Sequence, residues 1–232
     1  MLTLDHHASG RHFLQIPDPS PVPDRILRAM SLRTIDHRGS EFGVLGLKVI
    51  DGLKQVLRTR HPVAIYPASG TGAWEAAPVN VLSPGDAVLL VDTMSGLASA
   101  DYRHDEWGVD VIVSGSLKCL KLPPGISFNA LSPKALAASK TAKLPKAFRA
   151  WDEVVEMNKT GYCPCTPITN LLYSLHEAMN MLLSQGLETV LAHYQRWAAG
   201  VRGAVRAWGL PIRCAGPAVG SPVLTGMPPA AD

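Results

Sequence analysis

The feature that most constrains the fold is a short apolar run that ends in a loop of small residues. Residues 107–113 (WGVDVIV) are rich in valine and isoleucine and too few for a typical helix, so they predict a buried strand. The loop that follows, residues 114–119 (SGSLKC), contains Lys118. Ligands of open α/β sheets bind beyond the carboxyl ends of the strands, and partial burial there lowers the pKa of a lysine. Because a neutral amine can form a Schiff base with a carbonyl, Lys118 is a candidate nucleophile, with an ordinary surface lysine as the alternative.

A second predicted strand leads into a glycine-rich turn and the start of a helix. Residues 63–66 (VAIY) predict the strand, and residues 68–77 (ASGTGAWEAA) follow it. Backbone amides at a helix N-terminus favour an anion, and glycines let the chain approach a phosphate closely. No Gly-Lys-Ser/Thr follows, as a Walker loop would require, and Glu75 occupies the third glycine position of the dinucleotide fingerprint. The turn therefore predicts a phosphate cradle or, alternatively, a tight turn with its helix cap.

An aspartate ends a third predicted strand. Residues 87–91 (AVLLV) follow a Ser-Pro-Gly-Asp turn and lead directly to Asp92. A carboxylate at the end of a buried strand commonly holds a cationic ligand group or a metal. Asp92 is therefore a second candidate ligand-binding residue, with a loop-capping aspartate as the alternative.

The remaining chain alternates between helical patterns and short apolar runs. Residues 11–23 are too rich in proline for a helix and predict an extended arm. Apolar spacing predicts helices over residues 42–58, 146–157, 166–186 and 187–209. A strand is expected over 125–130, followed by a polar stretch to residue 145. After residue 209 the sequence predicts a short strand and a proline-rich tail. Strands that alternate with helices indicate the α/β class.

Composition argues against several classes of function. The formal net charge of the 232 residues is +3, without a basic stripe, which argues against nucleic-acid binding. The densest cationic cluster is interpreted as a solvated face; it contains Lys140, Lys143, Lys146 and Arg149. No apolar run approaches the ~18 residues of a membrane helix, so no membrane association is expected.

The N-terminus and the cysteines predict a cytoplasmic protein. The first ten residues are polar and rich in histidine, unlike a signal peptide. Four cysteines in a chain without a leader indicate free thiols in a reducing compartment. Cys163 and Cys165 lack a second ligand pair at zinc spacing, so no metal site is predicted.

The lysine, the aspartate and the phosphate cradle together match one ligand, pyridoxal 5′-phosphate (PLP). Lys118 would bind the aldehyde, and Asp92 would keep the ring nitrogen protonated, which makes the ring an electron sink. The phosphate would be held by the amides of Thr71, Gly72 and Ala73 and by the Thr71 hydroxyl. Each signal is weak alone, but their order along the chain is much more specific.

These segments resemble the serine–glyoxylate and alanine–glyoxylate aminotransferases, class V members of the fold-type I PLP enzymes. The resemblance is carried by residues 69–76 (SGTGAWEA), 91–96 (VDTMSG) and 114–118 (SGSLK). It implies an α/β large domain with helices on both faces of the sheet. It also implies transfer of an amino group from serine or alanine to glyoxylate through a Lys118 Schiff base. Finally, it implies a homodimer in which Thr166 reaches the phosphate of the neighbouring subunit.

The sequence also departs from the family pattern. A block of strand–helix units that relatives carry near residues 90 and 91 is absent, and with it the aromatic residue that stacks on the cofactor ring. The chain ends before the small C-terminal domain and its substrate-binding arginine. Leu117 replaces a polar residue, usually glutamine, that helps to hold the phosphate, and leucine cannot donate a hydrogen bond.

The resemblance divides the chain and leaves alternatives for its function. We expect an N-terminal arm (1–23), a shortened PLP-binding large domain with its closing helices (24–208) and the start of a truncated C-terminal domain (209–232). One alternative is a catalytically impaired remnant that at most binds PLP or pairs with an intact subunit. Another is the desulfurase or lyase chemistry of other class V enzymes. The segments 74–75 and 101–105 favour a transaminase over this alternative.

Overall fold

A four-stranded mixed sheet forms the centre of the protein. The computed structural model describes residues 20–83, 85, 87–214, 216 and 219–228, so most of the predicted N-terminal arm lies outside the described residues. The strands are β1 (Val63–Tyr66), β2 (Leu90–Asp92), β3 (Val111–Gly115) and β4 (Ser127–Ala130), in the order β1-β4-β3-β2. β2 runs parallel to β3, whereas β4 runs antiparallel to both β1 and β3. The strands β1, β2 and β3 therefore end at the same edge of the sheet.

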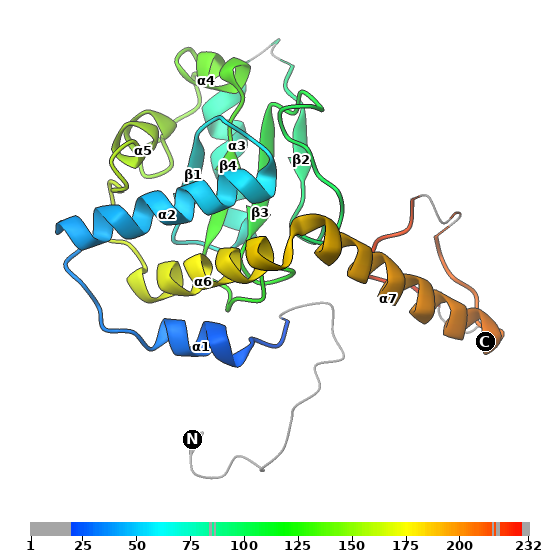
Figure 1. The fold of residues 1–232 in the computed structure, drawn as a ribbon. Coiled ribbons are helices and arrows are strands. Elements are labelled where there is room, and N and C mark those ends of the chain that lie inside the picture. The colour runs from blue at the N-terminus through cyan, green and yellow to red at the C-terminus, as the bar shows by residue number, and fades with distance from the viewer. Residues whose placement is uncertain (1–19, 84, 86, 215, 217–218, 229–232) are drawn as a thin grey trace, which may run out of the picture.

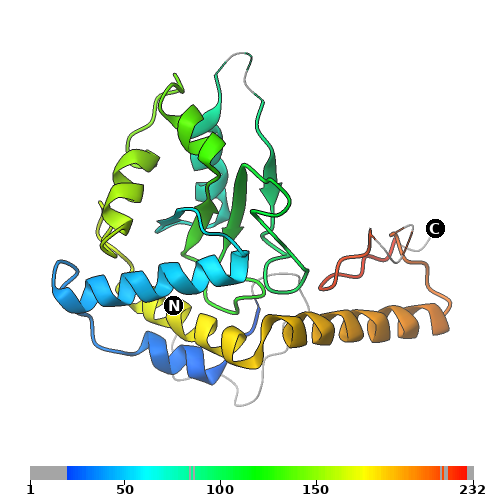
Figure 2. The same cartoon turned by 45° about the horizontal axis from the view of Figure 1, so that its top comes forward.

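Helices cover both faces of this sheet, as the resemblance implied. They are α1 (Asp24–Met30), α2 (Ser40–Leu57), α3 (Gly70–Val81), α4 (Pro133–Ser139), α5 (Trp151–Asn158), α6 (Thr169–Gln185) and α7 (Leu187–Ala207). Helices α1, α2 and α6 pack on one face, and α3, α4 and α5 pack on the other (Figure 1). Helix α7 runs away from the sheet in both orientations of the ribbon (Figure 2).

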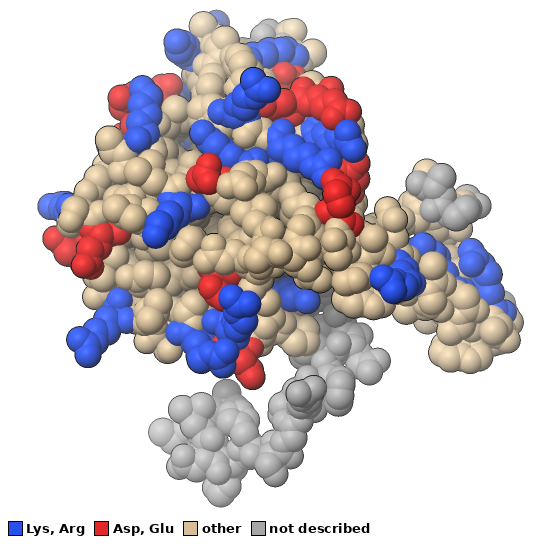
Figure 3. All heavy atoms as spheres, viewed as in Figure 1, with Lys and Arg blue, Asp and Glu red and all other residues tan. Residues whose placement is uncertain are grey.

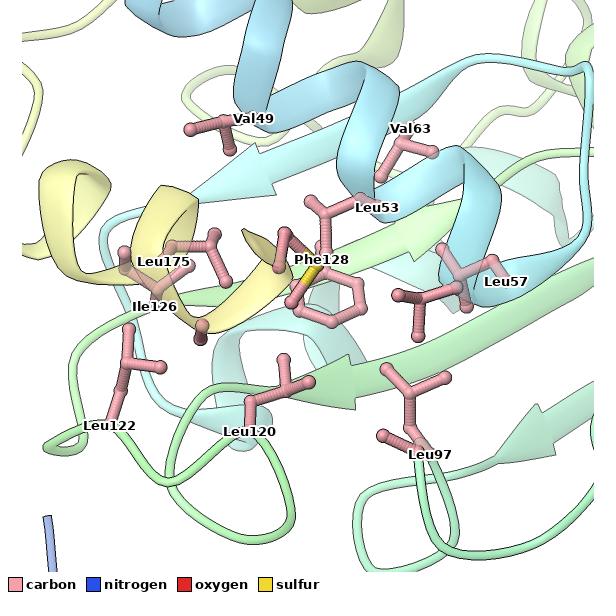
Figure 4. Packing of buried hydrophobic residues seen from close by; sticks show 14 of the residues in the cluster. Val49, Leu53, Leu57, Val63, Leu97, Leu120, Leu122, Ile126, Phe128 and Leu175 are labelled. Atoms are coloured by element: carbon pink, nitrogen blue, oxygen red, sulfur yellow. The ribbon is translucent and has the colours of Figure 1, made fainter. Parts of the chain in front are cut away.

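Two separate hydrophobic clusters stabilise the sheet from its two sides. Figure 4 shows Phe128 of β4 at the centre of the larger cluster, near Leu53 of α2 and Leu175 of α6. The smaller cluster joins the alanines of α3 to Trp151, whose Nε1 donates to the Tyr66 hydroxyl over 2.7 Å. Burial of one such large side chain stabilises the fold by about 2–3 kcal/mol. The fold therefore depends on both helical layers.

Close packing of α2 requires a glycine at one position. A Cβ on Gly46 would lie 1.9 Å from the carbonyl oxygen of Gly161, in the turn that follows α5. Gly161 itself has a φ of +82°, which favours glycine. These two glycines allow the turn to lie directly against α2.

Several predicted boundaries differ from the structure for identifiable reasons. The strand expected over 87–91 is only Leu90–Asp92, because the Asp110 carboxylate accepts the amide of Leu89 (2.8 Å) and the ladder ends there. The helix expected from residue 146 begins at Trp151, and the preceding segment is held to α4 by a bond from Lys146 Nζ to the Ser139 carbonyl.

Three further expectations about secondary structure were wrong. The polar stretch after residue 130 contains α4, which Ser132 caps by accepting the amide of Ala135 (3.1 Å). The helix expected to begin at Thr166 starts at Thr169, because the backbone of Ile168 is not helical (φ −84°, ψ 73°). Among the described residues after 209, no strand forms.

The charged side chains are mixed on the visible surface. On the face drawn in Figure 3, basic and acidic residues alternate over the sheet-covering helices rather than forming one patch of a single sign. None of the helices in the described part of the chain is both long and apolar enough to cross a membrane.

Candidate functional site

The three predicted ligand-binding segments meet at the shared edge of the sheet. They are the start of α3, the loop after β2 and the loop after β3. Met94, in the loop after β2, contacts both of the others: its methyl carbon lies 2.1 Å from a Cβ placed on Gly70, and its sulfur 2.9 Å from one placed on Gly115. The glycines at these positions therefore allow the three loops to lie side by side.

Lys118 is half-buried in the loop that follows β3. Its Nζ donates to Ser95 Oγ over 3.1 Å, which links this lysine to the loop after β2. The side chain lines a cavity of ≈ 370 Å³ together with Ser95, Tyr194 and Trp197, and residues 222–225 form another part of its wall. The predicted nucleophile thus faces a space large enough for a small ligand.

Asp92 is exposed and turned toward the start of α3. Its Oδ2 accepts the indole N–H of Trp74 over 2.8 Å, and its Oδ1 accepts the amide of Met94 over 2.7 Å. The second contact is the local capping turn that was the alternative interpretation of this residue. The carboxylate therefore caps its own loop and also binds α3.

The start of α3 has the features of an anion-binding turn. Ser69 occupies the cap position without a side-chain bond to the helix, so the hydroxyl satisfies none of the first amides. Thr71 is exposed, and a Cβ on Gly72 would lie 2.4 Å from the Cβ of Ala68, so only glycine fits there. Ala73 is fully buried against the sheet, which leaves its amide, rather than its side chain, for the predicted role.

A buried hydroxyl lies beside the same turn. Ser127 Oγ, on β4, has no hydrogen-bond partner within the described part of the chain. It lies 3.8 Å from the position that a Gly72 Cβ would occupy. A buried polar group without a partner costs about 1–3 kcal/mol, which indicates a site completed by another molecule.

Thr166 lies outside this group of contacts. It is exposed, in the loop that joins α5 to α6. Neighbouring Cys165 and Pro167 line a small apolar cavity (≈ 40 Å³) with Pro67, which precedes the glycine-rich turn. The loop therefore contacts the chain near the predicted phosphate cradle, and the predicted contact of Thr166 with a second subunit remains a prediction.

The residues present fit PLP in their chemistry and partly in their placement. An amine, a carboxylate and an anion-binding helix start share one sheet edge, and the orphan Ser127 hydroxyl lies next to Gly72. However, the described residues that line the cavity of Lys118 do not include Asp92. Met94 lies between the two glycines that flank the site, and a flexible methionine can move aside for a ligand.

Sequence reasoning missed four residues that make contacts here. Ser95, Trp74, Ser127 and Arg149 bind the predicted residues or lie within about one side-chain length of them. Ser95 and Trp74 lie within the quoted motifs 91–96 and 69–76, but neither was assigned a site role, whereas Ser127 and Arg149 lie outside those motifs. Arg149 was interpreted as part of a solvated face, whereas its guanidinium pairs with Glu75 on α3.

Comparison with known proteins identifies relatives over most of the chain, although no family model matches it. The serine–glyoxylate aminotransferase of Arabidopsis thaliana is 30% identical over 290 positions, covering 88% of this chain and 72% of the relative. The L-aspartate–glyoxylate aminotransferase of Paracoccus denitrificans is 31% identical and covers 85% of this chain and 71% of the relative.

Solved structures share the fold. Pyridoxamine–pyruvate aminotransferase from Mesorhizobium loti has a TM-score of 0.84 at 20% identity, covering 93% of this chain and 77% of that one. Ureidoglycine–glyoxylate aminotransferase from Bacillus subtilis has a TM-score of 0.82 at 16% identity, covering 95% and 79%.

The first of these sequence alignments also shows an internal difference. It spans 290 positions, more than the 232 residues of the chain, so the Arabidopsis protein has residues inside the aligned region that this chain lacks. On the evidence of these identities and of the shared fold, the chain belongs to the glyoxylate aminotransferases of the fold-type I PLP-dependent enzymes.

Proposed function

We propose that this protein is a transaminase that moves an amino group from serine or alanine to glyoxylate, with Lys118 as the residue that binds PLP covalently. The observation that carries the proposal is the meeting of Lys118, Asp92 and the start of α3 at one sheet edge, through Ser95, Trp74 and Met94. Relatives that are 30% and 31% identical over most of the chain are named serine–glyoxylate and L-aspartate–glyoxylate aminotransferases.

Bound PLP would supply an aldehyde for an amine and a ring that withdraws electrons from the substrate. The Lys118 amine is oriented by Ser95 Oγ at 3.1 Å, and as a free amine it can accept a proton from the substrate α-carbon and return it. The Asp92 carboxylate would hold a proton on the ring nitrogen by its negative charge. The Trp74 indole fixes the direction of that carboxylate.

The phosphate would lie at the start of α3. The first-turn amides, of which that of Gly72 also donates to the Ser69 carbonyl over 2.9 Å, and the exposed Thr71 hydroxyl would donate to it, and Gly72 leaves room for close approach. We further propose a homodimer in which Thr166 of one subunit donates to the phosphate held by the other. The exposure of Thr166 supports this role.

A second candidate function is that of an impaired family member that binds PLP without turnover. The support for it is that Asp92 lies outside the group of residues lining the Lys118 cavity, and that internal residues present in a relative are missing. Positioning errors of about 1 Å can reduce catalysis ~100-fold, so binding can survive where turnover does not.

Addition of PLP to the purified protein distinguishes these functions. We expect a visible absorption band in the parent protein and none in Lys118→Ala, because only a primary amine at this position can bind the aldehyde. Addition of serine or alanine should then bleach the band, and glyoxylate should restore it. An equal band in Lys118→Ala would disprove the lysine assignment, while a band that neither amino acid bleaches would favour the impaired form.

A further inference from the structure

We propose that Arg149 is a phosphate-binding residue of this site, which supplies the charged donor that Leu117 cannot. The proposal rests on the proposed function for the identity of the ligand, a phosphate ester, and it adds a residue that the motifs of the sequence do not contain. It also replaces the interpretation of Arg149 as part of a solvated face.

The backbone of Arg149 is held firmly against α3. Its carbonyl accepts Nδ2 of Asn80 over 2.7 Å, and Oδ1 of the same asparagine accepts the amide of Trp151 over 3.1 Å. Asn80 is fully buried near the end of α3, and Trp151 is fully buried at the start of α5. The arginine therefore projects from an anchored position and not from a free loop.

Its guanidinium lies at the first turn of α3. Nη2 is 4.0 Å from the position that a Cβ on Gly72 would occupy, and Nη1 pairs with the carboxylate of Glu75. The side chain of Arg149 is 26% exposed, whereas that of Glu75 is 64% exposed. The cation is thus more sheltered than its partner, and it remains accessible from solvent.

A cation at this place is electrostatically unfavourable unless an anion joins it. The N-terminus of a helix carries about half a positive charge, so it favours anions and disfavours a guanidinium. Glu75 offsets part of this repulsion, but it is a mostly exposed carboxylate, and such ion pairs contribute only about 0–1 kcal/mol. A phosphate between the helix start and the guanidinium would satisfy both.

A further donor without an acceptor lies at the same point. Ser127 Oγ is buried, has no partner among the described residues, and lies 3.8 Å from the same Gly72 position. The Gly72 amide donates to the Ser69 carbonyl over 2.9 Å, and the Ser69 side chain caps no amide of the first turn. A guanidinium can bind a phosphate through two parallel hydrogen bonds. Arg149 and Ser127 therefore both present donors at the start of α3, and the ligand class they fit is a phosphate group.

Inorganic phosphate tests this site without involving Lys118. We expect the unfolding temperature of the parent protein to increase as phosphate is added at constant ionic strength. The increase should saturate with phosphate concentration. Arg149→Gln should weaken the apparent affinity about tenfold, the loss expected for one charge-assisted contact. The phosphate affinity of Arg149→Lys should lie between those of the parent and Arg149→Gln, because lysine keeps the positive charge but lacks the two parallel donors of the guanidinium. Glu75→Gln should strengthen binding, because it removes the competing carboxylate.

Arg25→Gln is the matched control. Arg25 also pairs with a glutamate across two helices, 2.6 Å from Glu177, but it lies on α1. Its phosphate affinity should equal that of the parent. Equal affinity in the parent and in Arg149→Gln, or no saturable phosphate effect in the parent, would overturn the assignment.

The PLP band separates this inference from the proposed function. Arg149→Gln should weaken binding of PLP about tenfold but leave binding of pyridoxal, which has no phosphate, unchanged. Equal weakening for both ligands would overturn the assignment of Arg149 to the phosphate. If no band forms in the parent while Arg149→Gln still weakens inorganic phosphate, the proposed function fails and the phosphate site stands.

Discussion

Strands β4 (SFNA) and β2 (LVD) both mix apolar and polar residues but lie in different environments. β4 has neighbours on both sides, and all four of its residues are buried. β2 pairs only with β3, and its three residues are half-buried or exposed. The comparison teaches that burial depends on coverage by all neighbouring elements and not on hydrophobicity, because β1, which pairs only with β4 but is covered by α2 and α5, has three of its four residues buried. It also places Lys118, after the doubly paired β3, on a firmer scaffold than Asp92, at the end of β2.

The difference also explains the mixed outcome at the site. The lysine loop and the start of α3 adjoin strands that helices cover, and both lie at the shared edge of the sheet. The aspartate lies at the end of an edge strand with a single partner, and it bonds to Trp74 outside the cavity that Lys118 lines.

The largest expected effect comes from the buried side of the comparison. Phe128→Ala should lower the free energy of unfolding by about 3–5 kcal/mol, because Phe128 is fully buried between two helices and the sheet. Leu89→Ala, beside β2, should cost only about 0.5 kcal/mol, since that side chain is 49% exposed. Urea unfolding measures both, and similar losses would contradict the comparison.

The pH dependence of stability probes the loop that leads into β3. His104 is buried, and its Nδ1 shares a hydrogen bond with the Tyr102 hydroxyl (2.8 Å). Burial lowers the pKa of His104 to about 4. Between pH 6.5 and 4 the unfolded chain therefore binds a proton that the folded chain does not. The free energy of unfolding should fall by up to about 3 kcal/mol as the pH drops through this range. Above pH 6.5 this contribution of His104 should be fully present.

His104→Gln is the variant that isolates this effect. Its unfolding free energy should vary much less between pH 6.5 and 4.5 than that of the parent, because the titrating group is gone. A slope that the substitution leaves unchanged would assign the pH dependence to other groups.

A smaller effect than that of His104 concerns the anchoring of β2. Trp74→Phe removes the hydrogen bond to Asp92 and should lower the unfolding free energy by about 1 kcal/mol. Amide hydrogen exchange at Val91 should accelerate, because β2 has only one other partner. Trp107→Phe is the control: this tryptophan is 50% exposed and packs edge-on against Tyr102. Equal acceleration in both variants would show that the Asp92 bond does not anchor β2.

Much of the fold followed from local patterns. The strand Val63–Tyr66, the glycine-rich turn and the helices at α2, α6 and α7 were predicted, because apolar spacing and glycine act over a few residues. Helix α4 carried a local signal in its serine cap and proline, but its polar surroundings concealed it. The start of α5 carried no such signal. The loop before it is instead held by a contact with α4, the bond from Lys146 to the Ser139 carbonyl.

The sequence by itself determined which chemical groups end the strands: an amine, a carboxylate and a glycine-rich helix start, in the order of the family. It could do so because the positions of strand ends and turns depend mainly on residues that are close together in the sequence. Only the tertiary structure decided which of these groups face each other. Arg149 reaches α3 from 77 residues beyond Gly72, and Asp92 turns to Trp74, because such contacts depend on how distant segments pack. Packing energies are sums over neighbours, and no local pattern specifies those neighbours.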